Sequence, residues 1–243
     1  RHGAWQRVDR PQARAAPTTA ERPNSERAVL DFLAAQGVPV IPARIATTAD
    51  EAVAFARNLD APVVLKIASP DIQHKTEVGG VALNLRGDDA VRTAFEQMMQ
   101  RVKAAKPDAK LDGIIVSPMR GGGVELFVGT MRDPQWGAAI AVGLGGVFVE
   151  ALKDTSLRLL PIAEHDALEM LGELRGSALL DGFRGAPAVD RATLAKIIAA
   201  IGNAALALGP DLVSLEINPL LAFDGGIEAL DGLTVWEDAH EQH

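Results

Sequence analysis

The pattern of apolar residues changes near residues 117–120, and this change limits the folds open to the chain. Between residues 25 and 117, helical apolar spacing alternates with short buried runs. Between residues 118 and 238, short strand-like segments separated by glycine turns come first, followed by two helical stretches and a closing hairpin. These patterns predict an α+β protein with two α/β lobes, and a cleft between lobes is a common ligand site.

Local signals predict the individual elements. Ser25 and Thr48 are expected helix starts, because their side-chain oxygens can accept hydrogen bonds from the free amides of a first turn, and a long helix is expected to start at Asp88. Further helices are expected around residues 165–175 and 190–208. Strands are expected at residues 38–43, 63–67, 81–85, 113–117, 125–131, 137–142, 147–152, 157–160, 212–217 and 226–230.

The two ends of the chain do not have the pattern of a packed core. Residues 1–24 are rich in Arg, Ala and Pro, which is typical of a linker or an arm from a preceding domain. Residues 239–243 are expected to form a short tail. Because the chain begins with Arg1 and not with Met, we interpret it as a fragment or as a segment of a fusion.

Composition excludes several classes of function. The chain has no Cys, which rules out thiol catalysis and is compatible with the cytoplasmic location that we expect. A net charge of −8 and 4% aromatic residues argue against nucleic-acid binding, and no apolar run reaches the ~18–20 residues of a membrane span. Neither a Walker A motif nor a G-x-G-x-x-G turn opening a helix is present, so P-loop and Rossmann sites are excluded.

Lys66 is the first candidate functional residue. It interrupts the apolar run of residues 63–67, where a buried ammonium is costly unless a partner compensates it. A lysine at the end of a strand can also extend its ammonium to water. Its position alone therefore leaves two interpretations open, a phosphate-binding lysine and a solvated one.

The segment Ser69–Gly80 favours the first interpretation. It is a long polar connection between two strands, and long loops in compact domains are often functional. Its closing pair, Gly79 and Gly80, allows close approach of backbone amides to phosphate oxygens. His74 and Lys75 place an imidazole and a cation on the same loop.

The hairpin near the end of the chain suggests a metal site. Asp224-Gly225 is a strong two-residue turn signal, and a turn there places Asn218 opposite Asp231. An amide oxygen and a carboxylate on such neighbouring positions can share a hard cation such as Mg²⁺, and Glu216 lies on the same face. A polar pair on an exposed face is the alternative, and a turn at residues 225–226 would break the pairing.

Taken together, these segments resemble a known family. The run V-V-L-K-I-A-S-P-D-I-Q-H-K-T-E-V-G-G-V (63–81) resembles the first lobe of the ATP-grasp domain in ADP-forming acyl-CoA synthetases, which are related to the succinyl-CoA synthetase β subunit. Similarity to the second lobe lies in G-V-E-L-F-V-G-T-M-R-D-P-Q-W-G (123–137) and G-L-G-G-V-F-V-E-A-L-K-D (143–154). L-E-I-N-P-L (215–220) with L-D-G (230–232) is similar to the metal-binding end. The resemblance covers residues 25–236 and implies lobes at 25–117 and 118–238.

The resemblance implies a role for each matching residue, with ATP or ADP in the cleft. His74 corresponds to a histidine that accepts phosphate in archaeal relatives. The implied metal ligands for Mg²⁺ are Asn218 and Asp231, with Glu216 as a further candidate. The implied nucleotide contacts are Lys66, Gly79, Gly80, Val116, Ser117, Pro118, Met119 and Glu125, the four from 116 to 119 meeting adenine through their backbone. Relatives often carry Glu or Gln at the position of Ser117, which leaves base selectivity open.

The reaction implied is the conversion of an acid, CoA and ATP to acyl-CoA, ADP and phosphate through an acyl phosphate and a phosphohistidine. Nothing in the chain matches the CoA-binding domain or the CoA-ligase domain that carries the other phosphohistidine. We therefore expect these partners in the same full-length protein or in a second subunit.

Three other interpretations compete with this one. A regulatory acyl-CoA-synthetase-like module of a protein acetyltransferase usually lacks the loop histidine, whereas His74 is present here. A different ATP-grasp ligase is disfavoured by the run H-K-x-x-x-G-G-V. A purely structural scaffold leaves Lys66 without an explanation.

Overall fold

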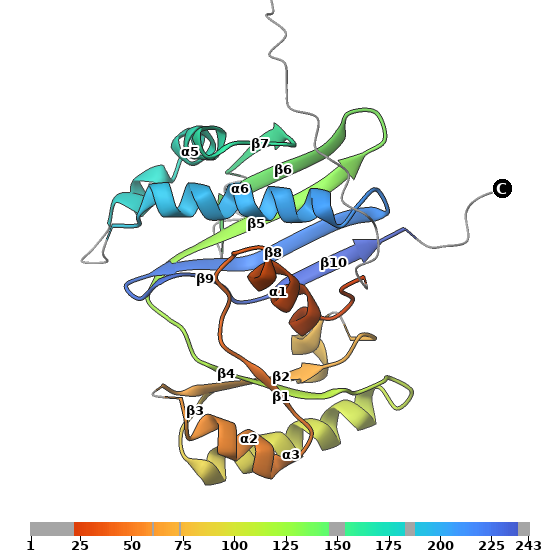
Figure 1. Ribbon diagram of the computed structural model, residues 1–243. Helices are drawn as coiled ribbons and strands as arrows, with labels where there is room; N and C mark the ends of the chain where they lie inside the picture. The colour runs from red at the N-terminus through yellow and green to blue at the C-terminus, as the bar shows by residue number, and fades with distance from the viewer. Residues whose placement is uncertain (1–21, 60, 73, 146–153, 183–187, 238–243) are drawn as a thin grey trace, which may run out of the picture.

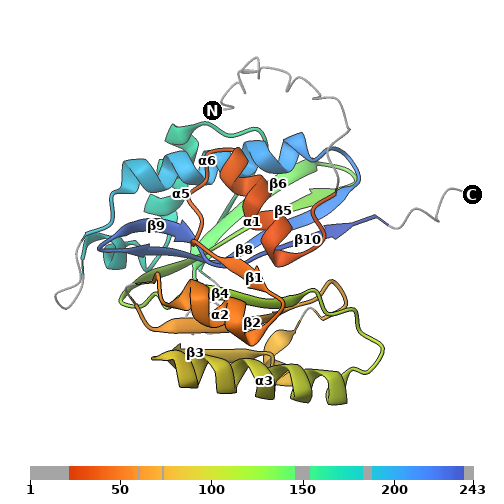
Figure 2. The same ribbon diagram turned by 60° about the horizontal axis from the view of Figure 1, so that its bottom comes forward.

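Two antiparallel sheets form the centres of two α/β units in the computed structural model, which describes residues 22–59, 61–72, 74–145, 154–182 and 188–237. Helices cover the outer face of each sheet, so the order of layers is helices, larger sheet, smaller sheet, helices (Figure 1). Figure 2 shows the same layers from a second direction. This arrangement agrees with the α+β class and the two lobes expected from the sequence.

The smaller sheet has the strand order β1-β4-β2-β3. Its strands are β1 (Arg44–Ala46), β2 (Val63–Ala68), β3 (Val81–Leu85) and β4 (Gly113–Pro118), and its helices are α2 (Ala49–Ala56) and α3 (Asp88–Ala105). The short 3-10 helix η1 (Lys75–Val78) lies between β2 and β3. Thr48 caps α2 as predicted, with Glu51 completing a capping box.

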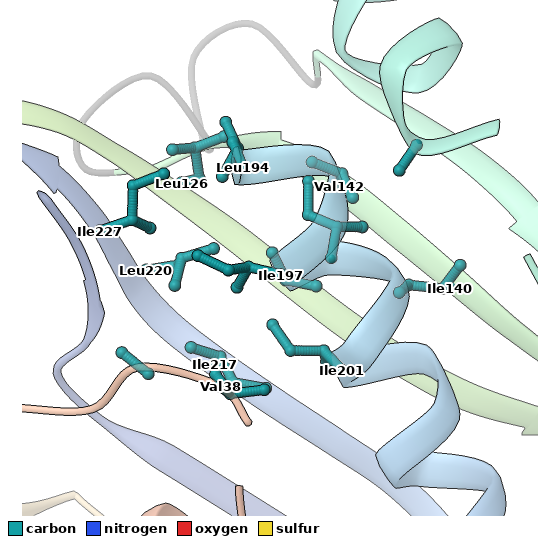
Figure 3. Close-up of a cluster of buried hydrophobic side chains, with 14 of the residues drawn as sticks. Val38, Leu126, Ile140, Val142, Leu194, Ile197, Ile201, Ile217, Leu220 and Ile227 are labelled. Atoms are coloured by element: carbon teal, nitrogen blue, oxygen red, sulfur yellow. The ribbon is translucent and has the colours of Figure 1, made fainter. Parts of the chain in front are cut away.

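The larger sheet has the order β10-β8-β5-β6-β7, with β9 paired to β8. Its elements are β5 (Gly123–Asp133), β6 (Gly137–Leu144), β7 (Thr155–Leu159), α5 (Glu164–Glu173), η2 (Ser177–Asp181), α6 (Arg191–Ala207), β8 (Leu212–Phe223), β9 (Gly226–Ala229) and β10 (Gly232–Trp236). Leu194, Ile197 and Ile201 of α6 point onto this sheet, where they meet Leu126, Ile140 and Ile217 (Figure 3). The predicted strand at 147–152 and the predicted tail lie outside the described residues.

The first helix, α1 (Glu26–Ala35), belongs to the larger unit. Val29, Leu30 and Leu33 are buried in the larger core, and Val40 forms a bridge with Ala229 of β9. The expectation that the first lobe starts at residue 25, and includes a strand at 38–43, therefore differs from the structure. The apolar stripe of α1 was visible in the sequence, but a stripe does not specify which sheet it will cover.

The predicted hairpin register is confirmed. Phe223 pairs with Gly226 and Leu220 with Ala229, as a turn at Asp224-Gly225 requires. The same register continues beyond β9, since Gly232 pairs with Ile217. Between these two paired segments the amide of Asn218 donates to the carbonyl of Asp231, with 3.4 Å between N and O, so the two residues lie opposite each other.

Within the residues that the structure describes, no helix is both long enough and apolar enough to cross a bilayer.

Candidate functional site

A cavity of about 630 Å³ is lined by residues from both units. The smaller unit contributes residues of β1, β2, β3 and β4 and of the segment that leads into η1, and the larger unit contributes α1, β8 and β10. The cavity brings together Lys66, His74, Glu216, Asn218 and Asp231, which the sequence had singled out in two distant segments. A polar cavity between two sheets can hold a charged ligand in reach of both units.

Lys66 projects from β2 into this cavity and is fully paired. Its Nζ lies 2.9 Å from Oε1 of Glu26, 3.0 Å from Oδ2 of Asp231 and 3.1 Å from the carbonyl oxygen of Leu230. These three acceptors replace the water that the ammonium loses, and they offset the free-energy cost of burying a lysine in a strand. The Lys66 side chain is only 18% exposed, so it does not extend its ammonium to water, which was one of the two interpretations that the sequence left open.

The charges of this cluster shift one another's protonation. Burial by itself would lower the pKa of Lys66, but Asp231 and Glu26 together hold that pKa above its ordinary value. Burial raises the pKa of Asp231, while the neighbouring Lys66 opposes the rise. Lys66 therefore stays protonated at neutral pH.

Glu26 is a member of the site that the sequence did not indicate. Its side chain is 6% exposed, and it forms ion pairs with Lys66 and, through Oε2, with Lys75 at 2.8 Å. An acidic residue in the first turn of a helix is common because it complements the helix dipole. Glu26 therefore looked ordinary in the sequence, and only the packing of α1 brings it to the two lysines.

The loop after β2 places His74 on the cavity. His74 is exposed, precedes η1 and makes no side-chain capping bond to it. Gly79 ends η1 in the left-handed conformation with φ of 65°, and its amide donates to the carbonyl of Thr76. The amide of Gly80 donates to the carbonyl of Lys75. Both glycine amides are thus engaged within the turn, and neither residue lines the cavity.

Asn218, Glu216 and Asp231 supply oxygen atoms beside the cavity. Nδ2 of Asn218 lies 3.4 Å from Oε1 of Glu216, which shows that both side chains are on one face of β8. Among the described residues, no three His, Asp or Glu side chains form a metal-binding group. An amide oxygen and one carboxylate nevertheless suit Mg²⁺, which commonly takes one or two protein carboxylates and completes its shell with water and phosphate oxygens.

The four residues expected around adenine, and Glu125 as a further expected nucleotide contact, do not line this cavity. Val116, Ser117 and Pro118 are buried in β4, where they pair with β2, and the amide of Met119 donates to the carbonyl of Pro62. Glu125 is exposed on β5. None of these five residues lines the cavity that holds Lys66.

Sequence comparison finds similarity to the ATP-grasp domain family and to ADP-forming acetate–CoA ligases. A model of the ATP-grasp domain family matches residues 16–235. The β subunit of acetate–CoA ligase (ADP-forming) I from Pyrococcus furiosus is 43% identical over 210 residues, which cover 86% of this chain and 90% of that subunit. Acetate–CoA ligase (ADP-forming) I of Archaeoglobus fulgidus is 39% identical, over 83% of this chain and 29% of its own length.

Solved structures show the same similarity. An acetyl-coenzyme A synthetase 1 from Ca. Korarchaeum cryptofilum, in complex with coenzyme A and Ca-AMPCP, superposes with a TM-score of 0.83 at 38% identity, over 88% of this chain and 93% of that one. A second structure of that enzyme holds Mg-AMPPCP, with a phosphohistidine segment pointing towards its nucleotide-binding site, and has a TM-score of 0.75 at 35% identity, over 88% of this chain and 93% of that one.

Proposed function

The chain belongs to the ATP-grasp domain family, and from this premise we propose that it is the nucleotide-binding, phosphoryl-transferring part of an ADP-forming acyl-CoA synthetase. The observation that carries the proposal is the single cavity lined by Lys66, His74, Asn218 and Asp231. A cation, a nucleophilic imidazole and two hard oxygen donors suit phosphoryl transfer through a phosphohistidine.

In this function Lys66 binds the phosphates of ATP or ADP. Its ion pairs with Glu26 and Asp231 keep it charged and oriented until an anionic ligand competes for it. Asn218 and Asp231 hold Mg²⁺ through their oxygen atoms, with Glu216 beside them. When bound, Mg²⁺ neutralises the charge of the phosphate oxygens during transfer.

His74 accepts a phosphoryl group and passes it on. Its ring is exposed on the cavity wall, so both a nucleotide in the cleft and a partner's phosphohistidine can approach it. In the synthetic direction the imidazole nitrogen attacks the terminal phosphorus of ATP and ADP leaves. The phosphoryl group then moves to the partner's histidine, forms an acyl phosphate with the acid, and is released as phosphate when CoA takes the acyl group.

Other contacts are proposed on the strength of the family resemblance. They are adenine on the backbone of Val116, Ser117, Pro118 and Met119, ribose on Glu125, and phosphates on the turn of Gly79 and Gly80. Because the two glycine amides are engaged in their own turn, a phosphate contact through them requires the turn to open.

The acyl chemistry belongs to partner domains. The P. furiosus relative is a β subunit of similar length to this chain, whereas the A. fulgidus relative is more than three times as long as the matched part. We propose that CoA-binding and CoA-ligase domains complete this protein in one of these two ways, in the cytoplasm.

Calorimetry tests the nucleotide site directly. We expect ADP and ATP to bind the chain in the presence of Mg²⁺, and the absence of any binding heat would refute the proposal. His74→Ala is expected to leave nucleotide affinity unchanged and to abolish acyl-CoA synthesis by the enzyme reconstituted with its partner domains. Full turnover by that variant would remove His74 from the phosphoryl path.

A further inference from the structure

Two lysine side chains hold the two oxygens of one buried carboxylate. Nζ of Lys66 lies 2.9 Å from Oε1 of Glu26, and Nζ of Lys75 lies 2.8 Å from Oε2. The side chains of Lys66, Lys75 and Glu26 are 18%, 15% and 6% exposed, respectively. Lys66 is hydrogen-bonded to Oε1, and Lys75 forms an ion pair with Oε2, so the two ammonium groups lie on the two oxygens of one carboxylate.

The spacing of the two ammonium groups also suits the oxygens of a phosphoryl group. Two oxygens of a phosphoryl group are about as far apart as the two oxygens of a carboxylate, so ammonium groups that fit one also fit the other. Lysine is a common point-charge ligand for phosphate oxygens. Lys75 also follows His74 directly and lines the same cavity, so the pair stands beside the candidate phosphoryl acceptor.

The carboxylate and the lysines come from different units. Glu26 is carried by α1, which Val29, Leu30 and Leu33 anchor in the larger core. Lys66 comes from β2 of the smaller sheet, and Lys75 comes from η1, which follows that strand. The contact therefore crosses between the units, and an anion entering the cavity meets the lysines at the place where Glu26 now holds them.

We propose that Lys66 and Lys75 form one binding site for a single phosphoryl group, and that Glu26 fills this site in the ligand-free chain. The inference rests on the proposed function and adds Lys75 as a phosphoryl ligand and Glu26 as its built-in competitor. The four side chains Lys66, Lys75, Glu26 and Asp231 cancel in formal charge. A phosphoryl anion that displaces Glu26 from the lysines keeps those two cations neutralised, and the freed Glu26 carboxylate turns to water or takes up a proton.

Opposite charge changes at the two ends of this contact test the proposal. Calorimetry is run on the full chain with MgATP, with MgADP and with inorganic phosphate. Lys75→Met is expected to weaken MgATP or phosphate binding by about tenfold or more, as the loss of one charge-assisted hydrogen bond implies. Glu26→Gln, which removes the competitor and keeps the shape, is expected to tighten binding of the same ligand several-fold.

Matched controls separate this site from general electrostatics. Lys103→Met removes an exposed lysine from α3, and Glu96→Gln removes an exposed carboxylate from the same helix. Neither residue lines the cavity, and both variants should bind as the wild type does. A tighter-binding Glu26→Gln variant cannot be explained by misfolding, and thermal unfolding checks the fold of Lys75→Met.

The results distinguish a nucleotide from free phosphate as the ligand. They also distinguish failure of the phosphoryl site from failure of the proposed function. A response to MgATP but not to phosphate assigns the site to the terminal phosphoryl group of the nucleotide, and a response to phosphate alone assigns it to free phosphate. If the wild type binds MgADP and MgATP but Lys75→Met and Glu26→Gln match their controls, the phosphoryl site is refuted and the proposed function stands. If the wild type binds no nucleotide and no phosphate, the proposed function fails first and the inference fails with it.

Discussion

The two units contribute opposite charges to the cavity between them. The smaller unit provides cations, Lys66 and Lys75, while the larger unit provides carboxylates, Glu26 and Asp231. Each group alone would be costly to bury, and among the described residues each one forms its ion pairs with groups of the other unit. Neither unit balances these charges by itself, so ligand affinity and the packing of the two units should respond to the same side chains.

The largest effect is expected from breaking this charge balance. Lys66→Met leaves Glu26 and Asp231 with one fewer cation in a largely buried cluster, and should lower the free energy of unfolding by about 3 kcal/mol. Urea denaturation measures the change, with the exposed Lys103→Met as the control. Adding Asp231→Asn to Lys66→Met should recover part of the loss. Equal stability of Lys66→Met and its control would show that the charges do not couple the units.

A comparison of the two cores sharpens the contrast between the units. Ile201 of α6 and Met98 of α3 are both fully buried, one in each core. Truncating either to Ala should cost about 3 kcal/mol, because the cavity left behind removes packing contacts as well as apolar burial. Leu83→Ala, on a side chain that is 59% exposed, should cost far less. A loss for Met98→Ala no larger than that for Leu83→Ala would contradict the close packing of the smaller core.

Gly80 connects the loop after β2 to the core of the smaller unit. A Cβ there would lie 2.5 Å from Cγ2 of Ile67 and 3.0 Å from the carbonyl oxygen of Lys75, so Gly80→Ala should cost about 2 kcal/mol. Gly121→Ala is a suitable control, because nothing lies within 4 Å of its added Cβ. Circular dichroism during thermal unfolding measures both variants. An unchanged melting temperature for Gly80→Ala would show that the turn yields easily.

The smallest expected loss of stability comes from removing the helix cap of α2 in the smaller unit. Thr48 accepts from the amide of Glu51 at 3.2 Å, and Thr48→Ala should cost about 1 kcal/mol through the lost helix cap. Because Thr48 does not line the cavity, nucleotide affinity should stay unchanged. Calorimetry and urea denaturation on the same sample measure the two quantities together. A change in affinity would mean that stability and ligand binding are linked throughout the smaller unit.

The sequence by itself determined the features that depend on neighbouring residues. Thr48 and Ser25 cap their helices because a cap is satisfied within one turn. The turn at Asp224-Gly225 set the register of β8 against β9, and the same register places Asn218 opposite Asp231. Lys66 was identified as a candidate because it interrupts an apolar run. The two lobes were predicted from the change in apolar periodicity near residues 117–120.

Only the tertiary structure decided the contacts between segments far apart in the chain. The stripe of α1 could pack on either sheet, and its choice of the larger core is what brings Glu26 to Lys66 and Lys75. The sequence suggested that the amides of Gly79 and Gly80 can bind phosphate, but in the structure both amides donate to carbonyls of their own turn. Forty residues separate Glu26 from Lys66, and no local preference acts over that distance. Burial decides such contacts, because a charge removed from water takes the partner that the fold places beside it.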